Sequence, residues 1–199
     1  MRKLIYILFL VQLIQFSGVS QNNEILFNGK NLNGWKIHGS ELWYVENGEL
    51  VSESGPNKEY GYILTEKNYD NFLLHLEFKQ ESNGNSGVFF RSTIDGVKIS
   101  GWQVEVAPTN LFTGGIYESY GRGWLIKPDA SVPDNLIEGD WNILEIKVLN
   151  SEVTTWLNGK QSVYLNDNKI KNGVGGIALQ IHDGGGIKVR WKNIYLQNL

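Results

Sequence analysis

The 199-residue sequence contains no cysteine, only three histidines and one methionine, and four prolines. Without cysteine the chain forms no disulfide and no thiolate metal site, and it offers no cysteine for a lipid anchor. The net charge of −3, with no block of basic residues, argues against nucleic acid or an anionic membrane as a partner. No apolar run reaches the roughly 20 residues that a membrane-spanning helix needs.

The first twenty residues have the organisation of a secretory signal peptide. Arg2 and Lys3 precede an apolar run from Leu4 to Ile14, and small residues follow at positions 18–20. We therefore expect residues 1–20 to be removed, which leaves residues 21–199 as one exported domain in the periplasm or the medium. After cleavage no contact with a membrane is expected. An uncleaved membrane anchor is the alternative.

Composition and turn signals favour an all-β fold. The sequence has 23 glycines, seven tryptophans and nine tyrosines, which suits twisted sheets joined by tight turns. Asn47-Gly48 and Asn158-Gly159 each lie between β-prone runs, and Asn-Gly favours a hairpin because a type I′ turn needs two residues with positive φ. The mature chain shows no convincing helical period. We therefore expect a sandwich of antiparallel strands.

The alternation of apolar residues in three expected strands, residues 72–79, 84–91 and 101–106, predicts the core. Successive strand residues point to opposite faces, so one face of each strand should lie between the sheets. The residues expected there are Phe72, Leu74, Leu76, Phe78, Val88, Phe90, Val104 and Val106. The stretch from Pro108 to Gly139 lacks this pattern, and we expect it to form loops over one sheet, where long loops are usually functional.

The other faces of the expected strands predict a polar groove. Gln103 and Glu105 lie two residues apart, opposite the apolar residues of their strand, and Arg91 lies opposite the apolar residues of strand 84–91. His182 shares a face with Gln180 near the end of a strand expected over residues 176–183. A sheet with one face on the core and the other toward solvent would bring these side chains together.

Blocks along the whole sequence resemble one bacterial family, in the expected order. The opening motif is Leu26-Phe27-Asn28-Gly29-Lys30-Asn31-Leu32-Asn33-Gly34-Trp35. Further blocks lie at residues 43–50, 85–91, 113–117, 141–142, 156–159 and 179–194, so that the match spans roughly residues 25–197. These blocks are similar to the 3-keto-disaccharide hydrolase domain family.

The resemblance implies a concanavalin-like jelly roll of two antiparallel sheets and a glycoside or oligosaccharide as partner. Members are described as cleaving 3-keto-glycosides, either as hydrolases or through β-elimination. The family strand carries glutamate and glutamine in the opposite order to Gln103 and Glu105, often followed by an aspartate where this chain has Ala107. The carboxylate therefore keeps its face of the strand but moves by about 7 Å.

Proton abstraction beside a ketone requires a base, a partner for the enolate oxygen and polar groups that hold the sugar. Glu105 and His182 are the acid/base candidates. Arg91 is the candidate for the enolate, because its guanidinium is always charged and presents forked donors. The predicted sugar-binding residues are Gln103, Gln180, Tyr117, which enters through the family block at 113–117, and Trp124, whose ring could stack on a sugar.

Other roles stay open for these residues. Arg91 and Glu105 could pair across neighbouring strands, and His182 could face solvent at its strand end. Glu105 is the only carboxylate on its strand, which disfavours a retaining glycosidase with two carboxyl groups about 5–5.5 Å apart. A divalent metal held by His182 and Glu105 stays open, although no zinc motif such as His-Glu-x-x-His is present. The alternative to a hydrolase or lyase is a sugar-binding module without catalysis.

Overall fold

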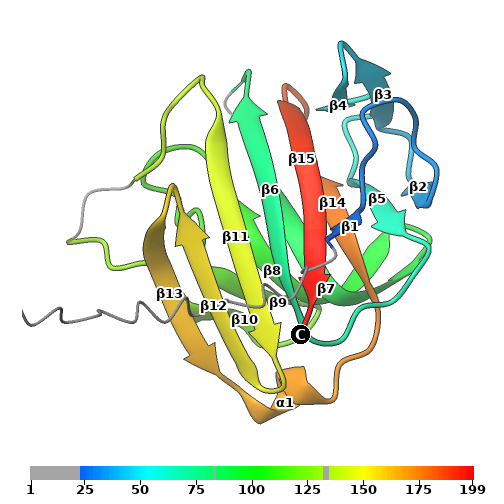
Figure 1. Cartoon of the computed structure of the whole chain (residues 1–199). Coiled ribbons are helices and arrows are strands. Elements are labelled where there is room, and N and C mark those ends of the chain that lie inside the picture. The colour runs from blue at the N-terminus through cyan, green and yellow to red at the C-terminus, as the bar shows by residue number, and fades with distance from the viewer. Residues whose placement is uncertain (1–22, 83, 132–134) are drawn as a thin grey trace, which may run out of the picture.

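Two antiparallel sheets pack face to face in the computed structural model, which describes residues 23–82, 84–131 and 135–199 (Figure 1). The expected signal peptide, residues 1–20, lies outside these ranges. The eight-stranded sheet has the order β13-β12-β11-β6-β15-β4-β3, with β1 paired to β15. Its strands are β1 (Glu24–Ile25), β3 (Leu42–Glu46), β4 (Glu49–Glu53), β6 (Phe72–Gln80), β11 (Asn142–Leu149), β12 (Glu152–Leu157), β13 (Lys160–Asn166) and β15 (Lys188–Asn198).

The seven-stranded sheet has the order β10-β9-β8-β7-β14-β5-β2. Its strands are β2 (Trp35–His38), β5 (Gly61–Thr65), β7 (Ser86–Asp95), β8 (Lys98–Val106), β9 (Ile116–Ser119), β10 (Gly123–Ile126) and β14 (Gly176–Ile181). One short helix, α1 (Asn168–Lys171), follows β13, and the side chain of Asp167 caps it by accepting from the backbone N–H of Lys169. No helix among the described residues is long and apolar enough to cross a membrane. The predicted all-β sandwich is confirmed.

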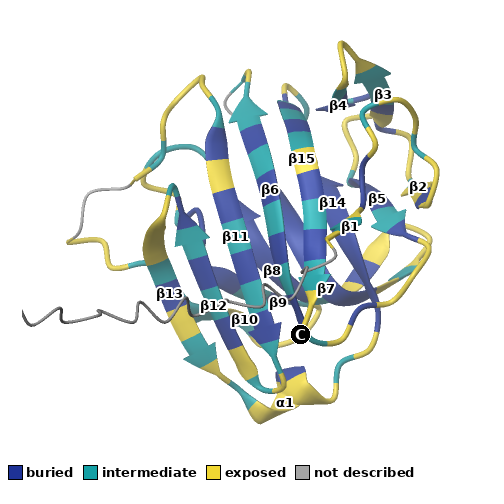
Figure 2. Cartoon of the chain, in the orientation of Figure 1, coloured by how far each residue is buried: buried dark blue, intermediate teal, exposed yellow. Residues whose placement is uncertain are grey.

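The core lies between the sheets and has the composition that the alternation predicts. All eight residues predicted for it are fully buried in one apolar cluster. Figure 2 shows the cause along β6, where buried residues alternate with more exposed ones. Full burial of one such side chain contributes about 1.5–3 kcal/mol, so the correct register of each strand is strongly favoured.

Both predicted Asn-Gly turns are present. Asn47 and Gly48 have φ values of 53° and 82°, and Asn158 and Gly159 have values of 51° and 78°. Two successive residues with positive φ are what a type I′ turn requires, and the turns join β3 to β4 and β12 to β13.

The stretch from Pro108 to Gly139 is only partly loop, which corrects the expectation. It contains the hairpin of β9 and β10, which extends the seven-stranded sheet beyond β8. Strands of four residues are too short to give a clear alternation in the sequence. The loop before β9 contacts β12, where the hydroxyl of Thr155 donates to the backbone oxygen of Gly114 at 2.7 Å.

Candidate functional site

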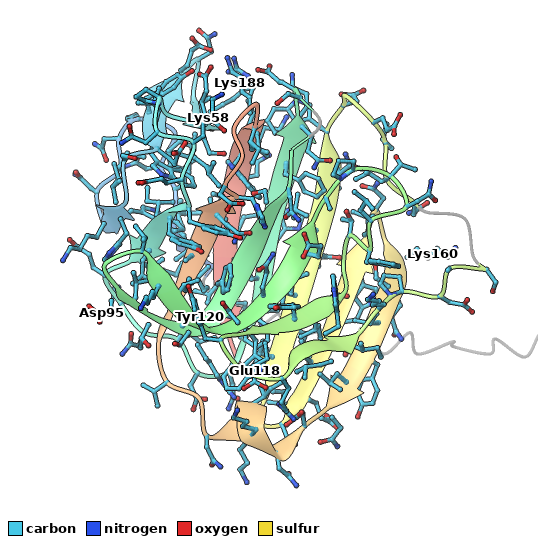
Figure 3. All side chains as sticks on the ribbon, turned by 180° about the vertical axis from the view of Figure 1, so that it is seen from behind. Lys58, Asp95, Glu118, Tyr120, Lys160 and Lys188 are labelled. Carbon is cyan, nitrogen blue, oxygen red and sulfur yellow. The ribbon has the colours of Figure 1, made fainter. Side chains whose placement is uncertain are left out.

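A groove of about 440 Å³ opens on the face of the seven-stranded sheet that points away from the core. Figure 3 shows this face, with Lys58 in the loop before β5 and Tyr120 at the turn between β9 and β10. The groove is lined by side chains of several strands and their loops, namely Tyr60, Tyr62, Asn85, Gln103, Glu105, Tyr117, Ser119, Tyr120, Trp124, Gln180 and His182.

Strand register brings the polar groups of this groove together. Gly87 of β7 lies opposite Glu105 of β8 on one side and opposite Gln180 of β14 on the other. A Cβ atom at position 87 would lie 2.4 Å from Nε2 of Gln103, closer than real Cβ contacts allow. The glycine therefore leaves the space in which side chains from the two flanking strands meet above β7.

The amide of Gln103 connects these groups. Its Nε2 donates toward Oε2 of Glu105 at 3.1 Å, Oε1 of Gln180 at 3.2 Å and the backbone oxygen of Ser86 at 3.3 Å. These contacts fix the orientation of the Gln103 amide and hold one oxygen of the Glu105 carboxyl group.

Glu105 is a buried carboxyl group with one oxygen unused. The residue is only 5% exposed, and its Oε1 has no hydrogen-bond partner among the described residues; the same is true of Oδ1 of Asn85. Burial raises the pKa of Glu105 to about 8, while the neighbouring Asn85 side chain acts weakly in the opposite direction. Glu105 therefore carries its proton at neutral pH and can donate it in the groove.

A second titratable group lies at the other side of the groove. The hydroxyl of Tyr60 is 3.0 Å from Nε2 of His182, and Nδ1 of His182 is 2.7 Å from Oδ1 of Asp183. The rings of Tyr60 and His182 also pack with centroids 4.6 Å apart. Because the Asp183 carboxylate only accepts, we assign the shared proton to Nδ1, so that Nε2 accepts from the Tyr60 hydroxyl.

Aromatic rings gather on the β9 and β10 side of the groove, where Tyr117 and Trp124 line it. The ring of Trp124 is edge-on to Tyr117, with centroids 5.6 Å apart, and edge-on to Phe112 at 5.5 Å. The Lys127 ammonium group lies 4.1 Å from the Phe112 ring centroid and 5.0 Å from that of Trp124. Trp124 is still 36% exposed, so it presents ring surface to a ligand.

Six of the seven site residues predicted from the sequence line this groove. They are Gln103, Glu105, Tyr117, Trp124, Gln180 and His182.

Arg91 does not lie in the groove, and the sequence prediction of its position is wrong. β7 has a bulge after Phe90, where Arg91 and Ser92 face a single residue of β8, and Arg91 has a φ of 47°. The bulge interrupts the alternation and turns the side chain away from its expected face.

The guanidinium group of Arg91 is fully buried and joins loops at the α1 end of the sandwich. It donates to the backbone oxygens of Asp70, Asn150 and Ile170, and to the side chains of Asp70 and Asn71, at distances of 2.6–3.2 Å. All of its donors are used, so Arg91 neither pairs with Glu105 nor reaches a ligand in the groove. None of the described residues that line the groove is lysine or arginine.

The sequence patterns do not predict Tyr60 and Tyr62, which line the groove, or Asp183, which contacts His182. Asp183 follows His182 directly in the chain, which is a signal that local sequence could have supplied. Tyr60 and Tyr62 have no such signal, because their rings reach the groove from β5 and the loop before it. Burial raises the pKa of Tyr62 to about 12, so its phenol stays protonated and can donate a hydrogen bond.

The described residues contain no group of three or more His, Cys, Asp or Glu side chains placed to hold a metal ion. Both ring nitrogens of His182 already have partners, Tyr60 and Asp183. A metal ligand needs a free nitrogen lone pair, so His182 would have to leave Tyr60 to serve as one.

Comparison with protein families matches residues 23–197 to the 3-keto-alpha-glucoside-1,2-lyase-like domain. The chain belongs to this family. A Bacteroides thetaiotaomicron protein named 3-keto-disaccharide hydrolase is 30% identical over 74 residues, which cover 33% of this chain and 26% of that protein. The matched region is thus about a quarter of the relative's length.

Solved structures share the architecture at low sequence identity, and this similarity shows the fold. A candidate glycosyl hydrolase from Parabacteroides distasonis is 22% identical, with 90% of this chain and 95% of that chain covered and a TM-score of 0.69. The carbohydrate-binding module CBM66 from Bacillus subtilis is 12% identical, with coverages of 83% and 96% and a TM-score of 0.67. A Bacillus subtilis protein with a galectin-like fold is 12% identical, with coverages of 89% and 94% and a TM-score of 0.71. The predicted jelly roll is confirmed.

Proposed function

We propose that this protein cleaves a 3-keto-glycoside in the groove of the seven-stranded sheet. The observation that carries the proposal is the buried carboxyl group of Glu105, which has an unused oxygen and a pKa raised to about 8. A buried group with a strongly shifted pKa in a cleft is typical of a catalytic acid or base. Family membership supplies the ketone-bearing sugar as the substrate class.

The rest of the groove fits a sugar. The amides of Gln103 and Gln180 can bond hydroxyl groups, and the exposed face of Trp124 can cover one side of a pyranose ring. Beside a C3 ketone the C2–H bond is acidic, so loss of that proton followed by departure of the C1 substituent breaks the glycosidic bond. Addition of water to the product completes a net hydrolysis.

Turnover of a defined 3-keto-glycoside tests this proposal. Purified protein is incubated with 3-keto-trehalose or a 3-keto-glucoside, with and without a chelator, and the released sugar or alcohol is measured over time. Release faster than in buffer supports the proposal, and the chelator arm shows whether a metal takes part. No release in either arm, at protein concentrations that bind the sugar, would refute it.

A sugar-binding module is the second candidate function. The similarity to CBM66 favours it, as does the lack of arginine and lysine among the described residues that line the groove, because neither side chain is then present there to stabilise a developing enolate. Under this alternative, calorimetry detects sugar binding by the wild-type protein, and Glu105→Gln leaves this binding intact. The wild-type protein then shows no turnover of the sugar.

Trp124→Ala is expected to weaken sugar binding about tenfold and to change kcat little. Stacking holds substrate and transition state equally, and aromatic contacts of this kind contribute about 0.5–1.5 kcal/mol beyond the buried area. The measurement is KM and kcat, or Kd for an unreactive sugar. Trp156→Ala is the matched control, since Trp156 lies on β12 in the other sheet and should leave both constants unchanged. Equal affinity in both variants would remove Trp124 from the site.

We also propose that the protein is exported after cleavage near residue 20. Arg2, Lys3 and the apolar run to Ile14 support this. N-terminal sequencing of protein from the periplasm or the medium is expected to begin near Gln21. Intact Met1 on a membrane-bound product would contradict the proposal.

A further inference from the structure

We propose that Tyr60 is the base that removes the C2 proton, with its own proton passing to His182. This inference rests on the proposed function and assigns to a third residue the proton abstraction for which the sequence offers Glu105 and His182 as candidates. It follows from the chain of contacts Tyr60–His182–Asp183, in which Tyr60 and His182 both line the groove.

The geometry matches the arrangement by which a histidine activates a hydroxyl group. Tyr60 donates to Nε2 at 3.0 Å, while Asp183 holds Nδ1 at 2.7 Å and stabilises the imidazolium that forms. The two loops that carry these residues are joined, because the backbone N–H of Gly184 donates to the backbone oxygen of Lys58 at 3.0 Å. The contact between Tyr60 and His182 is therefore held in place by Asp183 on the histidine and by the backbone hydrogen bond that joins the two loops.

His182 itself is poorly placed to reach a substrate proton. Its Nε2 lone pair already points at Tyr60, so a proton from the sugar reaches His182 only through the phenol oxygen. Tyr60 is thus the group that touches the substrate, and His182 and Asp183 act through it.

The step balances without any added reagent. The phenol oxygen of Tyr60 takes the C2 proton as the Tyr60 O–H proton moves to Nε2 of His182. The C2–H electrons form the C2=C3 bond of the enolate, and the charge collects on the ketone oxygen. Collapse of the enolate restores the ketone and forms the C1=C2 bond, while the C1–oxygen bond breaks. The departing oxygen takes the proton of Glu105, which His182 replaces afterwards through solvent.

Glu105 complements this assignment. Its burial keeps the carboxyl group protonated at neutral pH, so it serves as the acid for the leaving group. Base and acid then come from two separate elements, Tyr60 before β5 and Glu105 on β8.

Two substrates with different leaving groups separate the two roles. A 4-nitrophenyl 3-keto-glucoside needs no acid, because 4-nitrophenolate departs unaided, whereas a methyl 3-keto-glucoside does. Tyr60→Phe is expected to lower kcat by about 10²–10⁴-fold on both substrates, since both need the base. Glu105→Gln is expected to lower kcat strongly on the methyl glycoside and much less on the 4-nitrophenyl glycoside.

Tyr44→Phe is the matched control, because the Tyr44 hydroxyl also bonds a polar side chain, Glu53, but lies on β3 in the other sheet. It should keep full activity. Asp183→Asn is the second variant; the Asp183 side chain is 51% exposed, so the fold should tolerate it, and kcat should fall on both substrates with KM unchanged. Full activity of Tyr60→Phe, or a loss limited to the methyl glycoside, would overturn the inference alone. A wild-type protein that cleaves neither substrate would overturn the proposed function together with it.

Discussion

Replacing Arg91 with methionine is expected to lower the free energy of unfolding by about 3 kcal/mol. The change removes a buried guanidinium group whose donors bond the backbone oxygens of Asp70, Asn150 and Ile170. These oxygens come from the loop before β6, the β11–β12 turn and α1, so three segments lose a common partner. For a domain of this size the melting temperature should fall by about 6–12 °C.

The expected loss of unfolding free energy is at the lower end of the range for breaking a buried ion pair, because the acidic partner of Arg91 remains hydrated. The Asp70 side chain is 81% exposed, so removal of Arg91 leaves no buried carboxylate. What remains is the cost of unpaired carbonyl groups and of the space left by the guanidinium group.

Arg122→Met is the control for this experiment. Arg122 also pairs with two carboxylates, Glu118 and Asp167, but its side chain is 44% exposed, so the loss should stay below about 1 kcal/mol. Thermal unfolding of the three proteins gives the comparison, and turnover by Arg91→Met at 25 °C should stay near the wild-type value. An unchanged melting temperature with lost turnover would instead support the catalytic role that the sequence suggested for Arg91.

The sequence predicts the core and most of the groove because both depend on strand alternation. Gln103 and Glu105 are separated by Val104, and their burial on the outer face follows once Val104 packs inside. A one-residue slip would place both polar groups in the core, so the register is well determined.

Arg91 shows where alternation fails. Up to Phe90 the strand follows the expected pattern, and the bulge with a positive φ then changes the direction of the next side chain. Non-glycine residues seldom adopt this conformation, so a sequence pattern does not predict it. The hydrogen-bond partners of Arg91, Asn150 and Ile170, are also distant from it in sequence. These contacts depend on how the β11–β12 turn and α1 pack.

Tyr60 was missed for a different reason. The contact with His182 joins residues 122 positions apart, through two irregular loops tied by Gly184 and Lys58. Local patterns carry no information on such a pair, whereas the neighbouring strands β5 and β14 bring it together in the fold.

Glu105→Gln is expected to give a more stable and less active protein. Burial raises the pKa of Glu105 from 4.5 to about 8, so between these pH values the folded protein holds a proton that the unfolded chain has released. Stability of the wild-type protein therefore falls as pH rises through this window. Glutamine has no charge to bury, and its NH₂ group can donate toward Oδ1 of Asn85, which has no hydrogen-bond partner in the described part of the chain.

The free energy of unfolding of the variant should accordingly equal that of the wild-type protein at pH 4 and exceed it by about 2–4 kcal/mol at pH 8.5. This difference is smaller than the pKa shift would give at about 1.36 kcal/mol per pKa unit. Chemical denaturation at both pH values measures this difference.

At neutral pH, kcat on a methyl 3-keto-glucoside should fall by about 10²–10⁴-fold, because the amide cannot transfer a proton. Wild-type kcat should itself decline as pH rises through about 8, where Glu105 loses its proton. Full turnover by the variant, with no gain in stability at pH 8.5, would show that Glu105 is neither destabilising nor catalytic. Higher stability with lower turnover, the expected result, is typical of a residue kept for function at a cost in stability.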